Sequence, residues 1–130
     1  KITPALREAG FQGAWVRDLA RDTGDSETIM RTTLARLARR GELHQVVKDL
    51  YFLPDTMREL AATARRIATA ADGGIEAGAF RDATGLGRKR AIQILEYFDR
   101  LRLTQRVGDT HRLRSDSDLF AAEPPSGHPH

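Results

Sequence analysis

The chain has 130 residues, 40% of them hydrophobic and 30% charged, and a formal net charge of +3 at pH 7. This length fits one ordinary domain or two small ones. The absence of cysteine excludes disulfides, thiolate zinc sites and cysteine nucleophiles, and no apolar run approaches the roughly 20 residues that a membrane helix needs. We therefore expect a cytoplasmic protein without membrane contact. Because the chain begins at a lysine and not at a methionine, we also expect a piece of a longer protein.

The first half of the chain has the pattern of three helices followed by a β-hairpin. Apolar spacing predicts short helices at residues 3–9 and 15–21. A longer helix follows, with Asp25 or Ser26 as its N-cap and Gly41 as the residue that ends it. After Gly41 the period changes from helical to alternating, which predicts two short strands.

The second half repeats this order from Pro54 onward. Asp55 is the expected N-cap of a helix over residues 56–71, and a short helix is expected at residues 77–83. The longest amphipathic helix covers residues 88–101, and its buried stripe consists of Ala91, Ile94, Leu95, Phe98 and Leu101. Two more strands are predicted, at residues 103–107 and 111–114.

The two halves resemble each other closely enough to indicate an internal repeat. Leu43 and Tyr51 correspond to Leu103 and His111 at an offset of 60, while the helices match at 61. Three helices followed by a hairpin is the order of a winged helix-turn-helix. We predict a mainly α fold with small β-hairpins, built as two tandem winged helix-turn-helix domains at residues 1–53 and 54–115, with a disordered tail at residues 116–130. The alternative is a helical chain with two accidental hairpins.

The second hairpin can form in two registers. A two-residue turn at Gly108 and Asp109 would pair Val107 with Thr110, whereas a three-residue turn pairs Val107 with His111. We favour the three-residue turn because it serves the core better, with an inner face of Leu103, Gln105, Val107, His111 and Leu113. The outer face is then left with Arg106, Arg112 and Arg114. The same register in the first half unites Leu43, Val47, Tyr51 and Leu53.

The sequence gives little support for a catalytic or a metal-binding site. The four histidines have no metal-binding spacing, and two of them, His128 and His130, lie in the polar tail. Residues 85–89 look superficially like a phosphate loop but lack its Gly-Lys-Ser/Thr ending. No serine lies in a nucleophile-elbow pattern. We expect no enzyme activity, no catalytic residue, no metal and no cofactor.

A basic cluster opens the longest predicted helix. Gly87 is followed there by Arg88, Lys89 and Arg90, and residues 74–114 carry 9 basic against 5 acidic side chains. Cations in a first turn oppose the helix dipole, so a helix built only for stability would place acids there, as the first half does. Free backbone N–H groups together with cations form a phosphate-binding site. The alternative is an ordinary solvated basic turn.

The distribution of charge favours RNA over a DNA duplex. The exposed face of the longest helix is expected to carry Lys89, Gln93, Glu96 and Arg100, so an acid lies in its middle. The cations gather instead at the helix start and on the hairpin, which suits the backbone of a compact loop. A-form RNA also has a major groove too narrow for a helix, so proteins recognise RNA largely through loops and shape.

One segment resembles a known family. Phe80-Arg81-Asp82, the string Gly-Leu-Gly-Arg-Lys-Arg-Ala-Ile-Gln-Ile-Leu-Glu-Tyr-Phe-Asp-Arg-Leu at residues 85–101, Arg106-Val107-Gly108-Asp109 and Arg112-Leu113-Arg114 look like the C-terminal end of bacterial selenocysteine-specific elongation factors. The first half is similar to the preceding winged helix of that family, mainly in its layout. The family ends in four tandem winged helices, and this chain resembles the last two.

The resemblance implies RNA binding. In that family the last winged helix binds the messenger-RNA stem-loop that recodes UGA as selenocysteine, and the GTPase and tRNA-binding domains lie upstream. Together with the basic cluster, this predicts an RNA-binding set of Arg88, Lys89, Gln93, Gly87, Arg90, Arg81, Arg106 and Arg112. Arg102 stands where the family usually has a glycine, and Gln105 stands where it usually has an arginine, which puts one wing contact in doubt.

The expected partner is therefore an mRNA stem-loop bound by the second domain of a monomer. The first domain is expected to act as a spacer or as a contact to the ribosome, because its corresponding helix begins with acids. Two alternatives remain: a DNA-binding regulator, and an architectural or protein-interaction module, because many winged helices have such roles.

Overall fold

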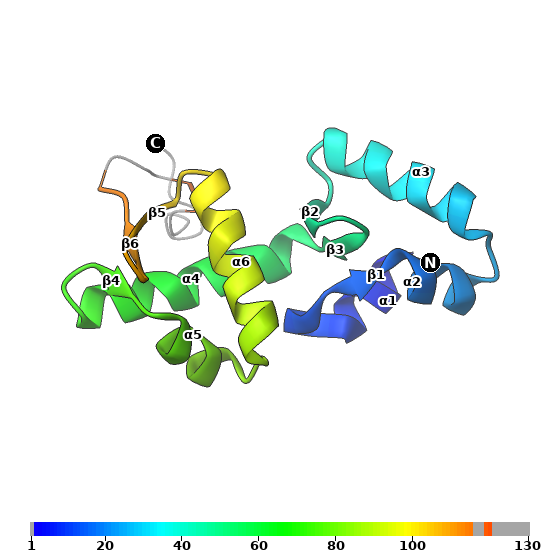
Figure 1. The fold of residues 1–130 in the computed structure, drawn as a ribbon. Coiled ribbons are helices and arrows are strands. Elements are labelled where there is room, and N and C mark those ends of the chain that lie inside the picture. The colour runs from blue at the N-terminus through cyan, green and yellow to red at the C-terminus, as the bar shows by residue number, and fades with distance from the viewer. Residues whose placement is uncertain (1, 116–118, 121–130) are drawn as a thin grey trace, which may run out of the picture.

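The computed structural model describes residues 2–115 and 119–120, which form two winged-helix units in tandem (Figure 1). The first unit consists of α1 (Ile2–Ala9), the 3-10 helix η1 (Gly10–Gln12), β1 (Ala14–Trp15), α2 (Val16–Thr23), α3 (Glu27–Arg39), β2 (His44–Val47) and β3 (Leu50–Phe52). The second unit consists of α4 (Pro54–Ala70), β4 (Gly74–Ile75), α5 (Ala77–Thr84), α6 (Arg88–Arg100), β5 (Thr104–Val107) and β6 (Thr110–Leu113). None of the described helices combines the length and apolar character needed to cross a membrane.

Each unit contains a three-stranded antiparallel sheet and not only a hairpin. The strand orders are β1-β3-β2 and β4-β6-β5. The sequence predicted the two long strands of each sheet and missed the third. β1 and β4 have only two residues each, so they are too short for the alternation by which strands are predicted.

The helix boundaries follow local capping chemistry. Ser26 is the N-cap of α3, where its hydroxyl accepts a hydrogen bond from the N–H of Ile29 (3.1 Å). The prediction that Asp55 caps the next helix was wrong, because α4 begins at Pro54, two residues before the predicted start, and its N-cap is Leu53. Proline suits a first helical position, where its missing N–H needs no partner. Asp55 lies in the first turn and forms an ion pair with Arg58.

The register of the second hairpin differs from the favoured prediction. Val107 pairs with Thr110 across a two-residue turn, and Gly108 adopts a left-handed φ of 64°. Thr104 and His111 are consequently buried, whereas the Val107 residue is 54% exposed at the tip of the β5–β6 hairpin, which we call the wing. Arg106 and Arg112 lie opposite His111 and Gln105, so they occupy opposite faces of the wing and not a shared outer face.

A buried polar cluster explains why apolar alternation gave the wrong register. The hydroxyl of Thr104 donates to Oδ1 of Asp99 (2.6 Å), and Nδ1 of His111 lies 2.8 Å from Oδ2 of the same carboxylate. Asp99 thus joins α6 to both wing strands through polar groups, which a search for apolar residues misses. In the first unit the positions equivalent to Thr104 and His111 are His44 and Tyr51, and Tyr51 packs in the apolar core there.

The hairpin of the first unit also differs from its prediction. Val47 pairs with Leu50 and not with Tyr51, and the ladder shifts between Gln45 and Val47. Because of this irregularity Val46 is fully buried, while Val47 is only partly covered.

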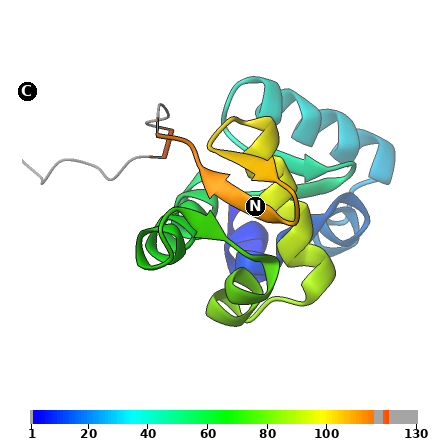
Figure 2. The ribbon, with the colours of Figure 1, turned by 60° about the vertical axis from the view of Figure 1, so that its left-hand side comes forward.

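The larger hydrophobic core crosses from one unit to the other. Val46, Leu50 and Phe52 of the first unit belong to the same buried cluster as Met57 and Phe98 of the second. A smaller cluster fills the first unit alone and includes Leu6, Val16, Leu19, Met30 and Leu34. The units are therefore packed against each other, with α6 lying beside the first unit in both ribbon views (Figures 1 and 2).

Part of the expected tail is ordered. Phe120 packs against the larger core, with its ring 5.6 Å from that of His44 and 6.3 Å from that of Phe98. Of the tail that was predicted to be disordered, the described residues include Leu119 and Phe120, and Phe120 makes these core contacts. The rest of that prediction, including both tail histidines, falls outside the described residues.

The polar cluster under the wing yields a stability prediction. Asp99→Ala leaves the buried Thr104 hydroxyl without its acceptor and removes the carboxylate that lies 2.8 Å from Nδ1 of His111, so we expect a loss of about 1–3 kcal/mol in the free energy of unfolding. Urea denaturation followed by circular dichroism measures it. The control is Asp82→Ala, which removes an exposed carboxylate and should change stability by less than about 0.5 kcal/mol. Equal effects of the two substitutions would contradict the assigned role of Asp99.

The shared core predicts that the two units unfold together. Trp15 fluorescence reports on the first unit and on its contact with the second, and helical circular dichroism reports on both units. We expect the two signals to give coincident urea transitions with one midpoint. Two separated transitions would mean that the packing between the units contributes little to stability.

Candidate nucleic-acid interface

The helix α6 lies between the wing and the first unit. Its inner side packs in the shared core through Ala91, Ile94, Leu95 and Phe98. Asp99 faces the wing, while Tyr97 faces the first unit, where its hydroxyl is 2.6 Å from Nδ1 of His44. The remaining side of α6 is open to solvent and forms the candidate interface.

The open side of α6 forms a shallow hollow lined by Arg88, Lys89, Ile92, Gln93 and Glu96. Arg88 and Lys89 are exposed, and neither makes a hydrogen bond or ion pair with another residue in the described part of the chain. Ile92 supplies an apolar floor between these charges. Residues 88, 92 and 96 are four residues apart, so helical spacing alone could have placed them on one face. The exposed face predicted from the sequence included Glu96 but not Ile92.

The start of α6 is positioned for an anion. Gly87 is its N-cap and offers no side-chain cap, and no acid lies in the first turn. The N–H groups of a first turn have no acceptor within the helix and point out of its N-terminal end, and Arg88 and Lys89 lie in that same first turn. Cationic side chains in this place destabilise the helix slightly on their own, so a bound anion would relieve an existing repulsion.

The structure separates the two wing arginines that the sequence had grouped. Arg106 lies 3.9 Å from Glu96 and donates from Nε to the carbonyl of Gly108 (3.0 Å), so it borders the hollow on α6. Arg112 points to the opposite face of the wing, where it donates to the carbonyl of Asp72 (2.7 Å). The prediction of one surface holding both arginines was wrong, because it depended on the incorrect hairpin register.

Arg81 and Arg90 were also predicted to bind RNA, but both contact other parts of the protein. Arg81 on α5 pairs with its neighbour Asp82 (3.2 Å) and does not line the hollow. Arg90 turns away from the hollow toward the first unit, where it contacts Gln12 and lies over the ring of Trp15. Burial lowers the pKa of Arg90 below its ordinary value. Arg88, Lys89, Gln93 and Arg106 therefore surround one open surface that begins at Gly87.

In the first unit an ion pair lines the hollow at the equivalent position. Arg31 stands where α6 has Ile92, and it donates two hydrogen bonds to Asp49 in the β2–β3 turn (3.0 and 3.1 Å). The hydrogen bond from Arg31 lowers the pKa of Asp49 below its ordinary value. In the first unit the cation at this position is thus paired with a carboxylate, whereas in the second unit Ile92 takes its place and the nearby Arg88 and Lys89 have no partner among the described residues.

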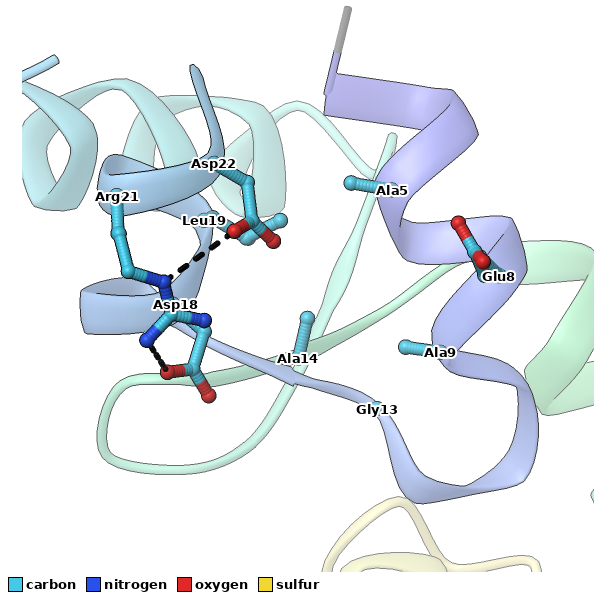
Figure 3. Close-up of a pocket in the computed structure, with 9 residues that line it drawn as sticks. All are labelled: Ala5, Glu8, Ala9, Gly13, Ala14, Asp18, Leu19, Arg21 and Asp22. Carbon is cyan, nitrogen blue, oxygen red and sulfur yellow. Dashed lines mark hydrogen bonds and ion pairs between the residues drawn. The ribbon is translucent and has the colours of Figure 1, made fainter. Parts of the chain in front are cut away.

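A different hollow of the first unit is acidic. It lies between α1 and α2 and is lined in part by Glu8, Asp18 and Asp22 (Figure 3). Arg21 pairs there with Asp18 (3.1 Å) and Asp22 (3.4 Å) and so offers no free cation. This surface is unsuited to a phosphate backbone. Across the described residues no group of three or more acidic, histidine or cysteine side chains could hold a metal ion.

Family models match both units. Residues 1–52 match a model described as "Selenocysteine-specific elongation factor, winged helix domain", and residues 66–113 match one described as "Elongation factor SelB, winged helix". The structure also resembles the mRNA-binding domain of elongation factor SelB from E. coli, solved in complex with SECIS RNA. The TM-score is 0.80 at 43% sequence identity, and the match covers 88% of this chain and 91% of that chain.

Curated relatives agree with the family models. The selenocysteine-specific elongation factor of Escherichia coli (strain K12) is 48% identical over 111 residues, and that of Haemophilus influenzae is 36% identical over 115 residues. These alignments cover 85% and 88% of this chain but only 18% of each relative, so the chain spans a small part of their length. From its two winged-helix units and these matches, the chain belongs to the SelB family of selenocysteine-specific elongation factors.

Proposed function

We propose that this chain binds an mRNA stem-loop of the SECIS type through the open side of α6 and the wing beside it. The observation that carries the proposal is the pair of exposed cations, Arg88 and Lys89, which have no protein partner among the described residues and border the same hollow as Gln93. The similarity to a SelB domain solved with SECIS RNA supports the same class of ligand.

The hollow suits an unstacked loop nucleotide. Arg88 and Lys89 would hold phosphates at the start of α6, and Arg106 would hold the stem backbone from the wing. Ile92 offers an apolar floor against which a base can pack, while Gln93 and Glu96 offer hydrogen-bonding groups at its edge. Single-stranded loops are the parts of RNA whose bases are accessible in this way.

In the complete factor, this binding would tether a translation GTPase to the transcript that it recodes at UGA. The chain itself would carry no catalytic step and need no cofactor, and it would work as a monomer in the cytoplasm. The first unit would serve as a spacer or as a contact to the ribosome. The exposed residues on the outer side of α3 support a contact role, since they include Thr28, Thr32 and Arg36.

Removal of the unpaired cations should weaken hairpin binding. For Arg88→Ala and Lys89→Ala we expect losses of about 1–3 kcal/mol in binding free energy, and a salt dependence shallower by roughly 0.7–0.9 log units for each phosphate that the variant no longer neutralises. Titration of labelled hairpin at several salt concentrations measures both. Arg36→Ala removes the same charge from the exposed side of α3 and is the matched control. An equal loss in the control would mean that only net charge matters.

Duplex DNA distinguishes this proposal from a winged-helix DNA regulator. Because the face of α6 places Glu96 where a major-groove helix would meet phosphates and base edges, we expect duplex DNA of equal length to compete poorly with the hairpin. Competition by unlabelled DNA at fixed salt measures this. Equal competition by DNA and hairpin would favour the regulator instead.

A further inference from the structure

Arg90 lies two residues from Arg88, yet its guanidinium contacts protein groups on both units. Nη1 donates to the backbone carbonyl of Gln12 in η1, and the guanidinium carbon lies 5.4 Å from the centre of the Trp15 ring. Nε donates to Oε1 of Gln93 (2.9 Å). One side chain therefore links the first turn of α6 to the first unit and to a residue that lines the RNA-facing hollow.

The partners of Arg90 are unusual for a cation. Within the described part of the chain it forms no ion pair with a carboxylate, and its charge is met by a carbonyl, an amide oxygen and an aromatic ring. An arginine in a first helical turn opposes the helix dipole as well. Its position is therefore stabilised by Gln12 and Trp15 of the first unit together with Gln93 of α6.

Other contacts fix the same side of α6 farther along. Tyr97 meets His44 in β2, and Arg100 donates to the carbonyl of Val46 while its guanidinium lies 5.5 Å from the Tyr97 ring centre. Residues 90, 97 and 100 are spaced so that they share one side of a helix. The first unit thus holds α6 at its start and near its end, and only the start also carries the unpaired cations.

The bond between Arg90 and Gln93 orients an amide in the hollow. An arginine can only donate, so the atom that faces Nε must be the amide oxygen of Gln93. The amide NH₂ group is then the part left for a ligand. Gln93 would present donors and would suit an acceptor, such as a phosphate oxygen or a base carbonyl.

We propose that Arg90 is a positioning residue for RNA binding and does not contact the RNA. It fastens the start of α6 to Gln12 and Trp15 of the first unit, and it turns the donor side of Gln93 toward the ligand. The first unit then sets the geometry with which Arg88, Lys89 and Gln93 meet the hairpin. This inference rests on the proposed function, and it replaces the prediction that Arg90 binds RNA directly.

The test compares salt dependence as well as affinity. Arg90→Ala should weaken hairpin binding roughly tenfold, because the interaction energy between residues in contact is commonly of that size. It should leave the salt slope unchanged. Arg88→Ala should instead reduce the slope by roughly 0.7–0.9. Arg90→Lys should not restore affinity, because lysine lacks the planar group that stacks on Trp15 while donating to two oxygens.

A variant in the first unit separates positioning from contact. Trp15→Leu lies outside the hollow, so it should also weaken binding without changing the slope, and the double variant with Arg90→Ala should lose less than the product of the two single losses. Circular dichroism and urea midpoints of the full chain identify any variant that loses affinity by unfolding. Arg90→Lys keeps the charge and supplies the second comparison if Arg90→Ala is unstable.

The outcomes keep the two proposals distinguishable. A slope reduced by Arg90→Ala as much as by Arg88→Ala would show a phosphate contact and overturn the positioning role. Unchanged affinity in Arg90→Ala and Trp15→Leu, with a loss in Arg88→Ala, would overturn the positioning role and leave the proposed function standing. No loss in Arg88→Ala or Lys89→Ala would overturn the proposed function itself.

Discussion

The structure depends on α6 being held from both sides, by the wing through Asp99 and by the first unit through Arg90, Tyr97 and Arg100. Polar contacts set the orientation of α6 on both sides, while burial in the shared apolar core supplies most of the stabilisation. The helix consequently keeps one open side, and that side carries cations without protein partners among the described residues. A preorganised surface of this kind loses little conformational entropy when it binds a folded RNA.

The two units illustrate how one fold provides two surfaces. Where the second unit has Ile92, the first has Arg31 bonded to Asp49. This ion pair joins helix and turn, and the charges of Arg31 and Asp49 are paired with each other. The second unit fixes its wing from beneath instead, through Thr104 and His111. On the outer surface of the second unit Arg106 lies 3.9 Å from Glu96, and Arg88 and Lys89 beside them have no partner among the described residues, so these cations are available for a ligand.

Sequence patterns predicted the repeat, the helices and the basic start of α6, because helical spacing and capping are local properties. They failed where the information is not local. The inner face of the wing is held by Thr104 and His111, and their partner Asp99 lies on another element, so apolar alternation selected the wrong register and grouped Arg106 with Arg112. Arg90 looked like a free cation because Gln12, the partner of its Nη1 group, lies 78 residues away in the chain. The left-handed φ of 68° at Arg102 explains why glycine is the expected residue there.

The central claim is that the open side of α6 and the adjoining face of the wing form the ligand surface. The most direct test is an NMR titration of the isotope-labelled chain with a SECIS-type hairpin. The account predicts the largest shifts at Lys89, Gln93 and Arg106, with smaller changes at Arg112 and at Arg31. Shifts concentrated on Arg112, or on the surface around Arg31 and Asp49, with α6 unaffected, would contradict it.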